Sequence, residues 1–452
     1  MLSSELVLPV ELIHSIVDIC AEGDTPVDTL KTLTLVSSCL RPRARKRLWE
    51  HVFLPPKQAI WLAKEGRDYS EIVEGLAAVE DLSTLAKYLH LNPYPPGILS
   101  LFLHRIHFVR VKHVFIQGYN ARAPAATAPR ALGYFLSQNS DLHTLELSSA
   151  RINALALFDL LSQSQLRALR TLRLSHLTLS TGDGDDEHLQ EVTWDAVATF
   201  LSSRDGCIER PLLQVLDLNT VYILSSRPLT YAFFSHPKSL FDISSLRKLT
   251  LHISRTTNQT LNDFASVIDL CYYSVQTLII YGWQDVTSSS SYLLGKFQNA
   301  EKVELVIHGS GHGSADLLVN SQPPESSFAL AFQQLSKLTR LQKLTLRLRF
   351  YLDAMTILNE SLHEMLMILS IQLPGIQEIC SYLSPAITVQ NNINMFLWAA
   401  VAVDGFTSYS VFSWNQTTRT LTQETTGSHH NEQSLDSDLL QTLMKARPRT
   451  CA

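Results

Sequence analysis

Two short segments of the sequence carry residue types that could bind a phosphate group or a metal ion. "HGSGHGS" (His308–Ser314) has the composition of a phosphate-binding loop, but Ser314 stands where the G-x-G-x-x-G pattern needs its third glycine. "DGDDEH" (Asp183–His188) has the carboxylates of a calcium-binding loop, but His188 replaces the glycine of that loop and Trp194 replaces its bidentate glutamate. We therefore expect a mobile loop at the first segment and a solvated acidic loop at the second.

Patterns for catalysis are missing from the sequence. It contains no G-x-S-x-G nucleophile motif and no H-E-x-x-H zinc motif. The six cysteines include no C-x-x-C pair, so we expect reduced thiols that pack as small apolar residues. His429 and His430 are adjacent in a polar segment but lack further ligands at metal-binding spacing. The sequence predicts that this chain is not an enzyme and holds no cofactor and no metal.

Composition and charge restrict the classes of partner. Of the 452 residues, 45% are hydrophobic and 17% are charged, so the chain can bury a sizeable core. The formal net charge is −5, whereas a nucleic-acid-binding protein needs concentrated positive charge. The longest clean apolar run, Met395–Val403, is far shorter than the ~20 residues that cross a bilayer, and the first residues lack the basic segment of a secretory signal. We expect an intracellular protein, cytoplasmic and/or nuclear, with no nucleic-acid and no membrane partner.

A repeated pattern, L-x-x-L-x-L, runs through the body of the chain. In a strand of this kind, alternate apolar residues point into a core and the residues between them point away from it. Segments between the repeats, such as Asp195–Ser203 and Leu261–Tyr272, carry helical patterns. The segments with the pattern are "VKHVFI" (Val111–Ile116), "LHTLEL" (Leu142–Leu147), "LRTLRL" (Leu169–Leu174), "LQVLDL" (Leu213–Leu218), "LRKLTL" (Leu246–Leu251), "VQTLII" (Val275–Ile280), "AEKVEL" (Ala300–Leu305), "LQKLTL" (Leu341–Leu346) and, more weakly, "IQEICS" (Ile376–Ser381).

This rhythm resembles that of leucine-rich repeats, so it predicts an α/β solenoid with parallel strands on the concave side and helices on the convex side. The asparagine of regular leucine-rich repeats is absent, which predicts irregular repeats. The expected regions are a helical module (residues 1–54), a helical linker with the first solenoid unit (55–105), the irregular solenoid (106–385), a C-terminal strand cap (386–425) and a polar tail (426–452). Within the linker, residues 57–91 carry a helical pattern that ends at the breaker "NPYPPG".

The first fifty residues predict three short helices. Pro9 suits the first turn of a helix, and apolar residues four apart, from Leu12 to Cys20, form one apolar stripe along it. Thr25 and Pro26 begin a second helix, and Ala44–Val52 gives a third helix or the start of a strand. Three helices of this size bury little by themselves, so the unit needs a partner surface or the rest of the chain.

The order of residues in this N-terminal unit resembles an F-box, the motif that docks on the Skp adaptor subunit of cullin–RING (SCF) ubiquitin ligases. One position departs from the pattern: four residues after Val36, where many F-boxes have an aromatic residue, this chain has Leu40. The residues that carry the resemblance are Leu8-Pro9, Glu11-Leu12, Ile16, Leu30, Leu33, "LVSS" (Leu35–Ser38) and Leu48-Trp49.

An F-box followed by degenerate leucine-rich repeats is similar to the layout of a large family of fungal F-box proteins. The resemblance implies a substrate-recognition adaptor that binds the Skp adaptor and, through it, a cullin, while the repeats bind a protein target whose identity is unknown. The residues expected to contact the Skp adaptor are Leu8, Pro9, Ile13, Ile16, Val36, Leu48 and Trp49. On the repeats, we expect the target to contact Ile279, Tyr281 and Val306, because these apolar residues fall at strand positions that point away from the core.

Two alternatives stay open at this stage. The chain could be a leucine-rich-repeat scaffold with no ubiquitin-ligase role, its N-terminal helices serving as the cap that repeat arrays need. The basic run "RPRARKR" (Arg41–Arg47) could be a nuclear import signal, or it could be the solvated face of the third helix, with its long side chains covering apolar neighbours.

Overall fold

The chain folds as α/β units, as expected. The computed structural model describes residues 10–21, 26–79, 82–92, 98–117, 127–148, 151–152, 157, 160–162, 166–179, 194–203, 210–221, 230–253, 261–283, 288–308, 331, 333–350, 378–385, 406–415 and 420–430. These residues fall into two compact units: Met1–Leu249 with Asp263–Cys271, and Thr250–Asn262 with Tyr272–Ala452. The boundary at Leu249 lies inside the range that the sequence predicts as a single solenoid.

Unit 1 begins with three short helices, as the sequence predicts: α1 (Val10–Ala21), α2 (Pro26–Val36) and α3 (Arg41–Glu50). Their shared core is small. Val17, Leu30 and Ala44 are buried, one from each helix, and Leu33, Leu40 and Leu48 pack around them while staying partly exposed. A core of this size stabilises the module weakly, so its attachment to the rest of the unit matters.

Six parallel strands of unit 1 stack side by side in the order of the chain. They are β1 (His51–Leu54), β2 (Tyr88–Leu91), β3 (His113–Gln117), β4 (Thr144–Ser148), β6 (Thr171–Leu179) and β7 (Val215–Val221). The short β5 (Arg151–Ile152) pairs with the end of β6. The connecting helices α4 (Lys57–Lys64), α5 (Ser70–Ala77), α6 (Leu82–Leu85), α7 (Ile98–Arg105), α8 (Thr127–Gln138) and α10 (Trp194–Ser203), together with the π-helix η2 (Tyr231–Ser235), complete the repeats.

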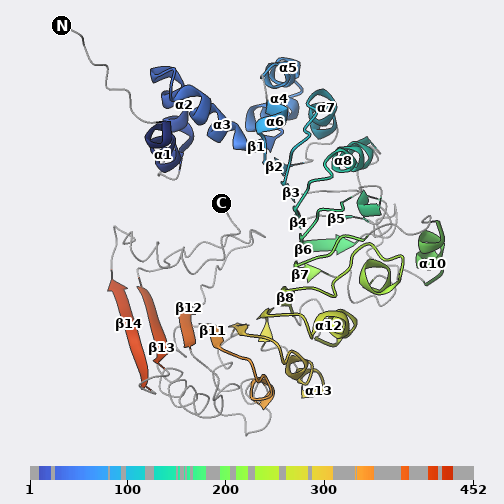
Figure 1. Ribbon diagram of the computed structural model, residues 1–452, viewed down its shortest axis with the longest axis vertical. Coiled ribbons are helices and arrows are strands. Elements are labelled where there is room, and N and C mark those ends of the chain that lie inside the picture. Colours follow the sequence, from blue (N-terminus) through green and yellow to red (C-terminus); the bar gives the residue numbers. More distant parts are fainter. Residues whose placement is uncertain are drawn as a thin grey trace. The chain divides into compact units, whose positions relative to one another are not determined.

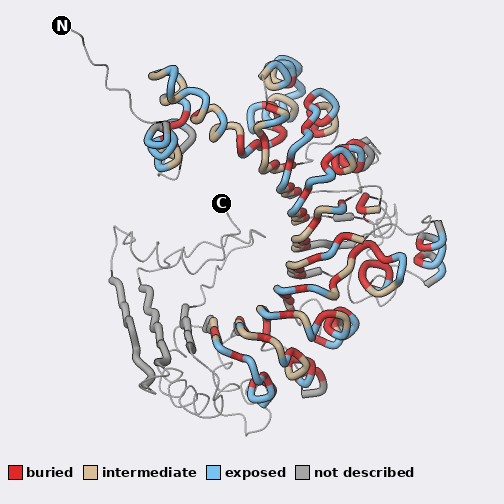
Figure 2. The backbone as a smooth tube through the Cα atoms, in the orientation of Figure 1, coloured by how far each residue is buried: buried red, intermediate tan, exposed pale blue. Residues whose placement is uncertain are grey.

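The strands bury one face against these helices. Along each strand the second and fourth residues point into the core, and each of them is at most 4% exposed. These core residues are Val52, Leu54, Leu89, Leu91, Val114, Ile116, Leu145, Leu147, Leu172, Leu174, Leu216 and Leu218. Figure 1 shows α4, α7, α8 and α10 on the same side of the strands, and Figure 2 shows the buried backbone between strands and helices. The other face of the strands, which we call the helix-free face, carries the residues in between.

Unit 2 continues the same architecture. Its parallel strands β9 (Thr277–Tyr281), β10 (Lys302–His308), β11 (Lys343–Phe350) and β12 (Glu378–Pro385) pair in register, and β13 (Phe406–Asn415) and β14 (Thr420–His430) then add as an antiparallel pair. Short helical segments α13 (Ser288–Ser291) and η6 (Leu294–Lys296) lie between β9 and β10 in the chain. Near the unit boundary are β8 (Lys248–His252), η4 (Leu261–Phe264) and α12 (Ala265–Cys271).

A glycine is required at the turn that follows β9. Gly282 has φ +77° and its amide donates to the carbonyl of Val306 at 2.9 Å. A Cβ atom at this position would lie 1.8 Å from the carbonyl oxygen of Ile253, so no other residue fits without backbone movement. The neighbouring Trp283 is fully buried, and this tight passage seats it in the core of unit 2.

All nine strands predicted from the L-x-x-L-x-L pattern are confirmed, from β3 to β12. Two more strands come first. β2 lies at the end of the stretch predicted as helical, residues 57–91, and β1 takes up the last four residues of the predicted helical module. The signal for β2 is present as "AKYLHL", an A-x-x-L-x-L segment in which Ala86 fills the first core position and is fully buried.

Other expectations concern the C-terminal strands and segments that the structure describes only in part. The last strand, β14, extends to His430, five residues beyond the predicted cap. The apolar run Met395–Val403, which falls within the predicted cap, lies outside the described residues, as does the acidic segment Asp183–His188. Of the glycine-rich segment, only His308, the end of β10, is described.

Candidate functional site

Five large apolar side chains are exposed among the described residues of the N-terminal module. On α1 they are Leu12 (51% exposed), Ile16 (42%) and Ile19 (71%), and at the end of α2 they are Leu35 (82%) and Val36 (70%). The spacing on α1, four and then three residues, puts its members on one side of that helix. We call these five residues the exposed apolar set. Grouped exposed apolar residues commonly mark protein-interaction sites.

The residues predicted to contact the Skp adaptor fall into three groups. Leu8 and Pro9 lie outside the described residues, and Ile13 lies in α1 with its side chain outside the description. Ile16 and Val36 are exposed. Leu48 packs against the module core and Trp49 is half-buried, so both lie partly inside the fold.

Sequence reasoning missed Leu12, Ile19 and Leu35 as exposed positions. It counted Leu12, Ile16 and Val17 as one apolar stripe, but the structure buries Val17 and leaves Leu12 and Ile16 outside. The available signal was the excess of apolar residues on α1, which form a wider stripe than a core with three buried apolar residues in the described part of the module can cover.

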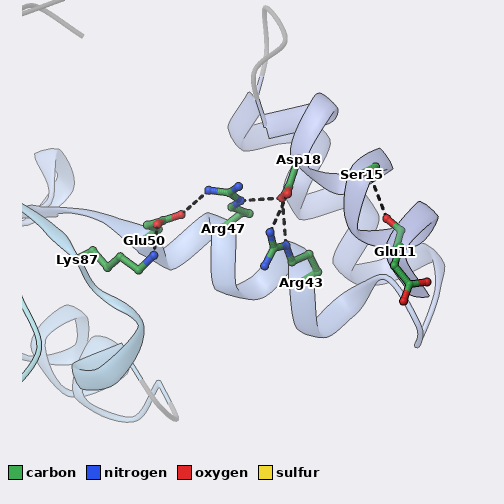
Figure 3. Close-up of polar contacts among 7 residues, drawn as sticks. All are labelled: Glu11, Ser15, Asp18, Arg43, Arg47, Glu50 and Lys87. Carbon is green, nitrogen blue, oxygen red and sulfur yellow. Dashed lines mark hydrogen bonds and ion pairs between the residues drawn. The ribbon is translucent and has the colours of Figure 1, made fainter. Parts of the chain in front are cut away.

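A chain of ion pairs ties this module to the strands (Figure 3). Asp18 of α1 accepts hydrogen bonds from two guanidinium groups of α3: Arg43 Nε and Nη2, at 3.0 and 2.7 Å, and Arg47 Nε, at 2.8 Å. Arg47 Nη1 also donates to Glu50 Oε2 at 2.9 Å, and Lys87 Nζ, just before β2, donates to Glu50 Oε1 at 2.7 Å. The chain of contacts therefore runs from α1 through α3 to the second strand.

The charges of this network control its protonation. The hydrogen bonds from Arg43 and Arg47 hold the pKa of Asp18 well below its usual range. Burial raises the pKa of Glu50, but hydrogen bonds from Lys87 and Arg47 outweigh burial and leave its pKa below the usual value. Both carboxylates are therefore ionised at neutral pH, and two cations of the basic run are used to build the module.

The helix-free face of β1, β2 and β3 carries two rows of stacked rings. His51, Tyr88 and His113 form one row, in which Tyr88 stacks on His51 at 4.3 Å between ring centroids and on His113 at 4.4 Å, with interplanar angles of 3° and 7°. Phe53, His90 and Phe115 form the second row, in which His90 stacks on Phe53 at 4.3 Å and on Phe115 at 4.6 Å, with both angles 10°. The in-register pairing of the strands causes the stacking, because it places equivalent residues one strand spacing apart. We call these six residues the ring ladder.

The imidazoles of the ring ladder are neutral at physiological pH. Burial lowers the pKa of His90 to about 4, with a further lowering from His51. Burial also lowers the pKa of His51 and of His113. For His113, electrostatic repulsion from His143, Lys112, His51 and Arg173 lowers the pKa further, in that order.

Charged residues continue the second row beyond the rings. Register places Glu146, Arg173 and Asp217 after Phe115 on successive strands, and Arg173 Nη1 donates to Glu146 Oε2 at 3.4 Å. Burial raises the pKa of Asp217 to about 6, although Arg173 and then Lys248 act in the opposite direction. Burial likewise raises the pKa of Glu146 against the effect of Arg173. The charge of Arg173 and the charges of the two acidic side chains therefore offset one another on the helix-free face.

The predicted target contacts in unit 2 need a correction. Ile279 is only 8% exposed and Val306 only 2%, while Tyr281 is half-buried, so the three do not form an open apolar surface. The reason is the register. Val306 lies between Tyr281 and Arg347 on the neighbouring strands, and these longer side chains flank it on both sides.

Two comparisons with known proteins identify no relative. No protein-family model matches this sequence, and no curated protein matches it either. Within the described residues, no helix is long and apolar enough to cross a membrane, and no cluster of three or more histidine, cysteine or acidic side chains is arranged to hold a metal ion.

Proposed function

We propose that this chain is the substrate-recognition adaptor of an SCF-type ubiquitin ligase. In this proposal the N-terminal module is an F-box that docks on the Skp adaptor and, through it, on a cullin, and the leucine-rich repeats bind a protein target. The chain performs no chemistry itself. It raises the rate of ubiquitin transfer by holding the target near the catalytic subunits. The proposed location is the cytoplasm and/or the nucleus.

The observation that carries the proposal is the exposed apolar set. Among its described residues, this three-helix module has three buried apolar side chains in its core and keeps five large apolar side chains in solvent, which is unfavourable unless a partner covers them. The ion-pair chain from Asp18 to Lys87 supports the same reading, because it fixes the module to the strands and so transmits a defined geometry between the two partners.

The second candidate is a repeat scaffold whose N-terminal helices only cap the array. A cap covers the end of the core with its own apolar side chains and presents a polar outer face. In this chain Ile19, Leu35 and Val36 are at least 70% exposed, which favours docking over capping.

A pair of matched valine substitutions tests the docking function. Val36→Asp replaces a side chain that is 70% exposed in the apolar set, and Val109→Asp replaces one that is 51% exposed in the same unit but outside the set. We expect Val36→Asp to weaken binding of the full chain to purified Skp adaptor by about 30-fold, as for a loss of ~2 kcal/mol at an interface hot spot, and Val109→Asp to leave it unchanged. Both variants should keep the wild-type melting temperature.

The outcome distinguishes the two candidates. Absence of adaptor binding by the wild-type chain, or an equal effect of both variants, would favour the scaffold. Substitution is preferable to deletion of the module, because α3 runs directly into β1 and its last residue, Glu50, holds Lys87.

A further inference from the structure

The two central rings of the ring ladder offer their edges to a ligand, because both faces of each are already occupied. Tyr88 has a ring stacked on each face, and so has His90, with centroid distances of 4.3 to 4.6 Å. Both side chains are nevertheless partly exposed, so the accessible part of each is its edge. On the outer strand, Phe53 is 61% exposed.

Ring edges select for a particular ligand chemistry. An aromatic ring is negative over its faces and positive at its edge, and a neutral imidazole adds an N–H donor at its edge. A carboxylate oxygen satisfies both. A nucleic-acid base, in contrast, binds aromatic side chains through their faces, and here the faces of the central rings are covered.

Beside the first row of the ring ladder lies an exposed lysine, Lys112, which has the sign that a carboxylate requires. Lys112 immediately precedes β3 and His143 immediately precedes β4, and the carbonyl of Lys112 accepts the amide of His143 at 2.8 Å, so the two residues are adjacent. Both side chains are exposed, and Lys112 makes no ion pair within the described part of the chain. Of the cations that act on the nearest ladder ring, His113, Arg173 is paired with Glu146, which leaves Lys112 for a ligand.

We propose that the ring ladder, with Lys112 and His143 at its border, binds an extended acidic segment of a partner protein. Glutamate or aspartate side chains of that segment would lie against the ring edges and pair with Lys112, while the in-register rings give a rigid surface that loses little side-chain entropy on binding. The inference goes beyond the docking function and stands without it; in a ubiquitin-ligase receptor, this surface would hold the target.

A pair of peptide probes tests the inference with the full chain. The probe is a dye-labelled peptide of alternating glutamate and serine, the control is the same peptide with glutamine in place of glutamate, and fluorescence anisotropy at low and moderate salt measures binding. We expect the glutamate peptide to bind and the glutamine peptide to bind at least about tenfold more weakly. Loss of one exposed ion pair in Lys112→Ala should weaken binding by about fivefold.

Two further variants separate a ladder site from bulk charge. Lys302→Ala removes an exposed lysine that begins β10 and should leave binding unchanged. Phe115→Leu removes a ladder ring but keeps an apolar side chain, and should weaken binding while the melting temperature stays close to wild type. Failure of the wild-type chain to bind the glutamate peptide, an equal effect of Lys302→Ala, or displacement of the peptide by a single-stranded oligonucleotide at comparable concentration would overturn the inference. None of these outcomes bears on Skp-adaptor binding.

Discussion

Replacing Glu50 by alanine should loosen the N-terminal module. The Glu50 side chain is only 9% exposed and accepts two charge-assisted hydrogen bonds, from Arg47 at 2.9 Å and from Lys87 at 2.7 Å. Each such bond contributes ~1.5–3 kcal/mol when its partner cannot reach water. Here Arg47 is 32% exposed and Lys87 41%, so both recover hydration when Glu50 is removed, and we discount each bond to ~1 kcal/mol. The expected loss is therefore about 2 kcal/mol of local stability.

Amide hydrogen exchange of the full chain measures this loss where it occurs. A change of about 2 kcal/mol raises the exchange rates of α3, β1 and β2 by about 30-fold, if these amides exchange through local opening. Glu301→Ala is the matched control. Glu301 also precedes a strand. Its carbonyl accepts the amides of Gln342 and Lys343, as the carbonyl of Glu50 accepts the amide of Lys87, but the Glu301 side chain makes no ion pair within the described residues.

A double-mutant cycle supplies the refutation. Lys87→Met removes the other end of the ion pair while keeping the length of the side chain. If the network acts as described, the two substitutions together cost less than the sum of their separate effects by at least ~0.5 kcal/mol. Additive effects, or a comparable loss in Glu301→Ala, would show that Glu50 does not couple the module to the strands.

Two further predictions follow from the strands themselves. The pKa of His90 falls from 6.5 to about 4 on folding, so the unfolded state binds more protons between these values and stability should fall as the pH drops through this window. Because His90 is partly exposed, we discount its effect on stability. Between about pH 7.5 and pH 5, we expect the free energy of unfolding, measured by denaturant titration, to fall by about 1 kcal/mol less in His90→Phe than in wild type. An identical pH dependence in wild type and variant would contradict this. Gly282→Ala should cost more than ~2 kcal/mol because its Cβ would meet the Ile253 carbonyl, whereas Gly66→Ala, with φ +67° and open space around it, should cost only ~1–2 kcal/mol; equal melting temperatures of the two variants would refute the steric argument.

The strands of the repeats could be predicted from the sequence because a strand that buries one face alternates core residues with residues of the other face. The leucine positions of each L-x-x-L-x-L segment identify its core residues, and no knowledge of the neighbouring strand is needed to find them. The same logic explains why the sequence predicts a helix over the residues that form β2. Its first core position holds Ala86 instead of a leucine, and its preceding residues carry a helical pattern.

Which apolar side chains are exposed could be decided only from the tertiary structure. In α1 both Val17 and Ile16 are apolar, and only packing against Leu30 and Ala44 decides that Val17 turns inward and Ile16 outward. In unit 2, Val306 has the correct strand position for an outward residue, yet longer neighbours on both sides cover it.

The ring ladder is the clearest case of a feature that the sequence contained but could not reveal. His51, Tyr88 and His113 lie 37 and 25 residues apart in the chain. Their rings stack only because three strands pair in parallel with one particular register, and a shift of one residue would turn every ring to the other face. The alternation of apolar residues was enough to predict nine strands and the leucines that they bury. Only the pairing of distant strands decided which exposed side chains became neighbours, because that register is set by the packing of the whole core.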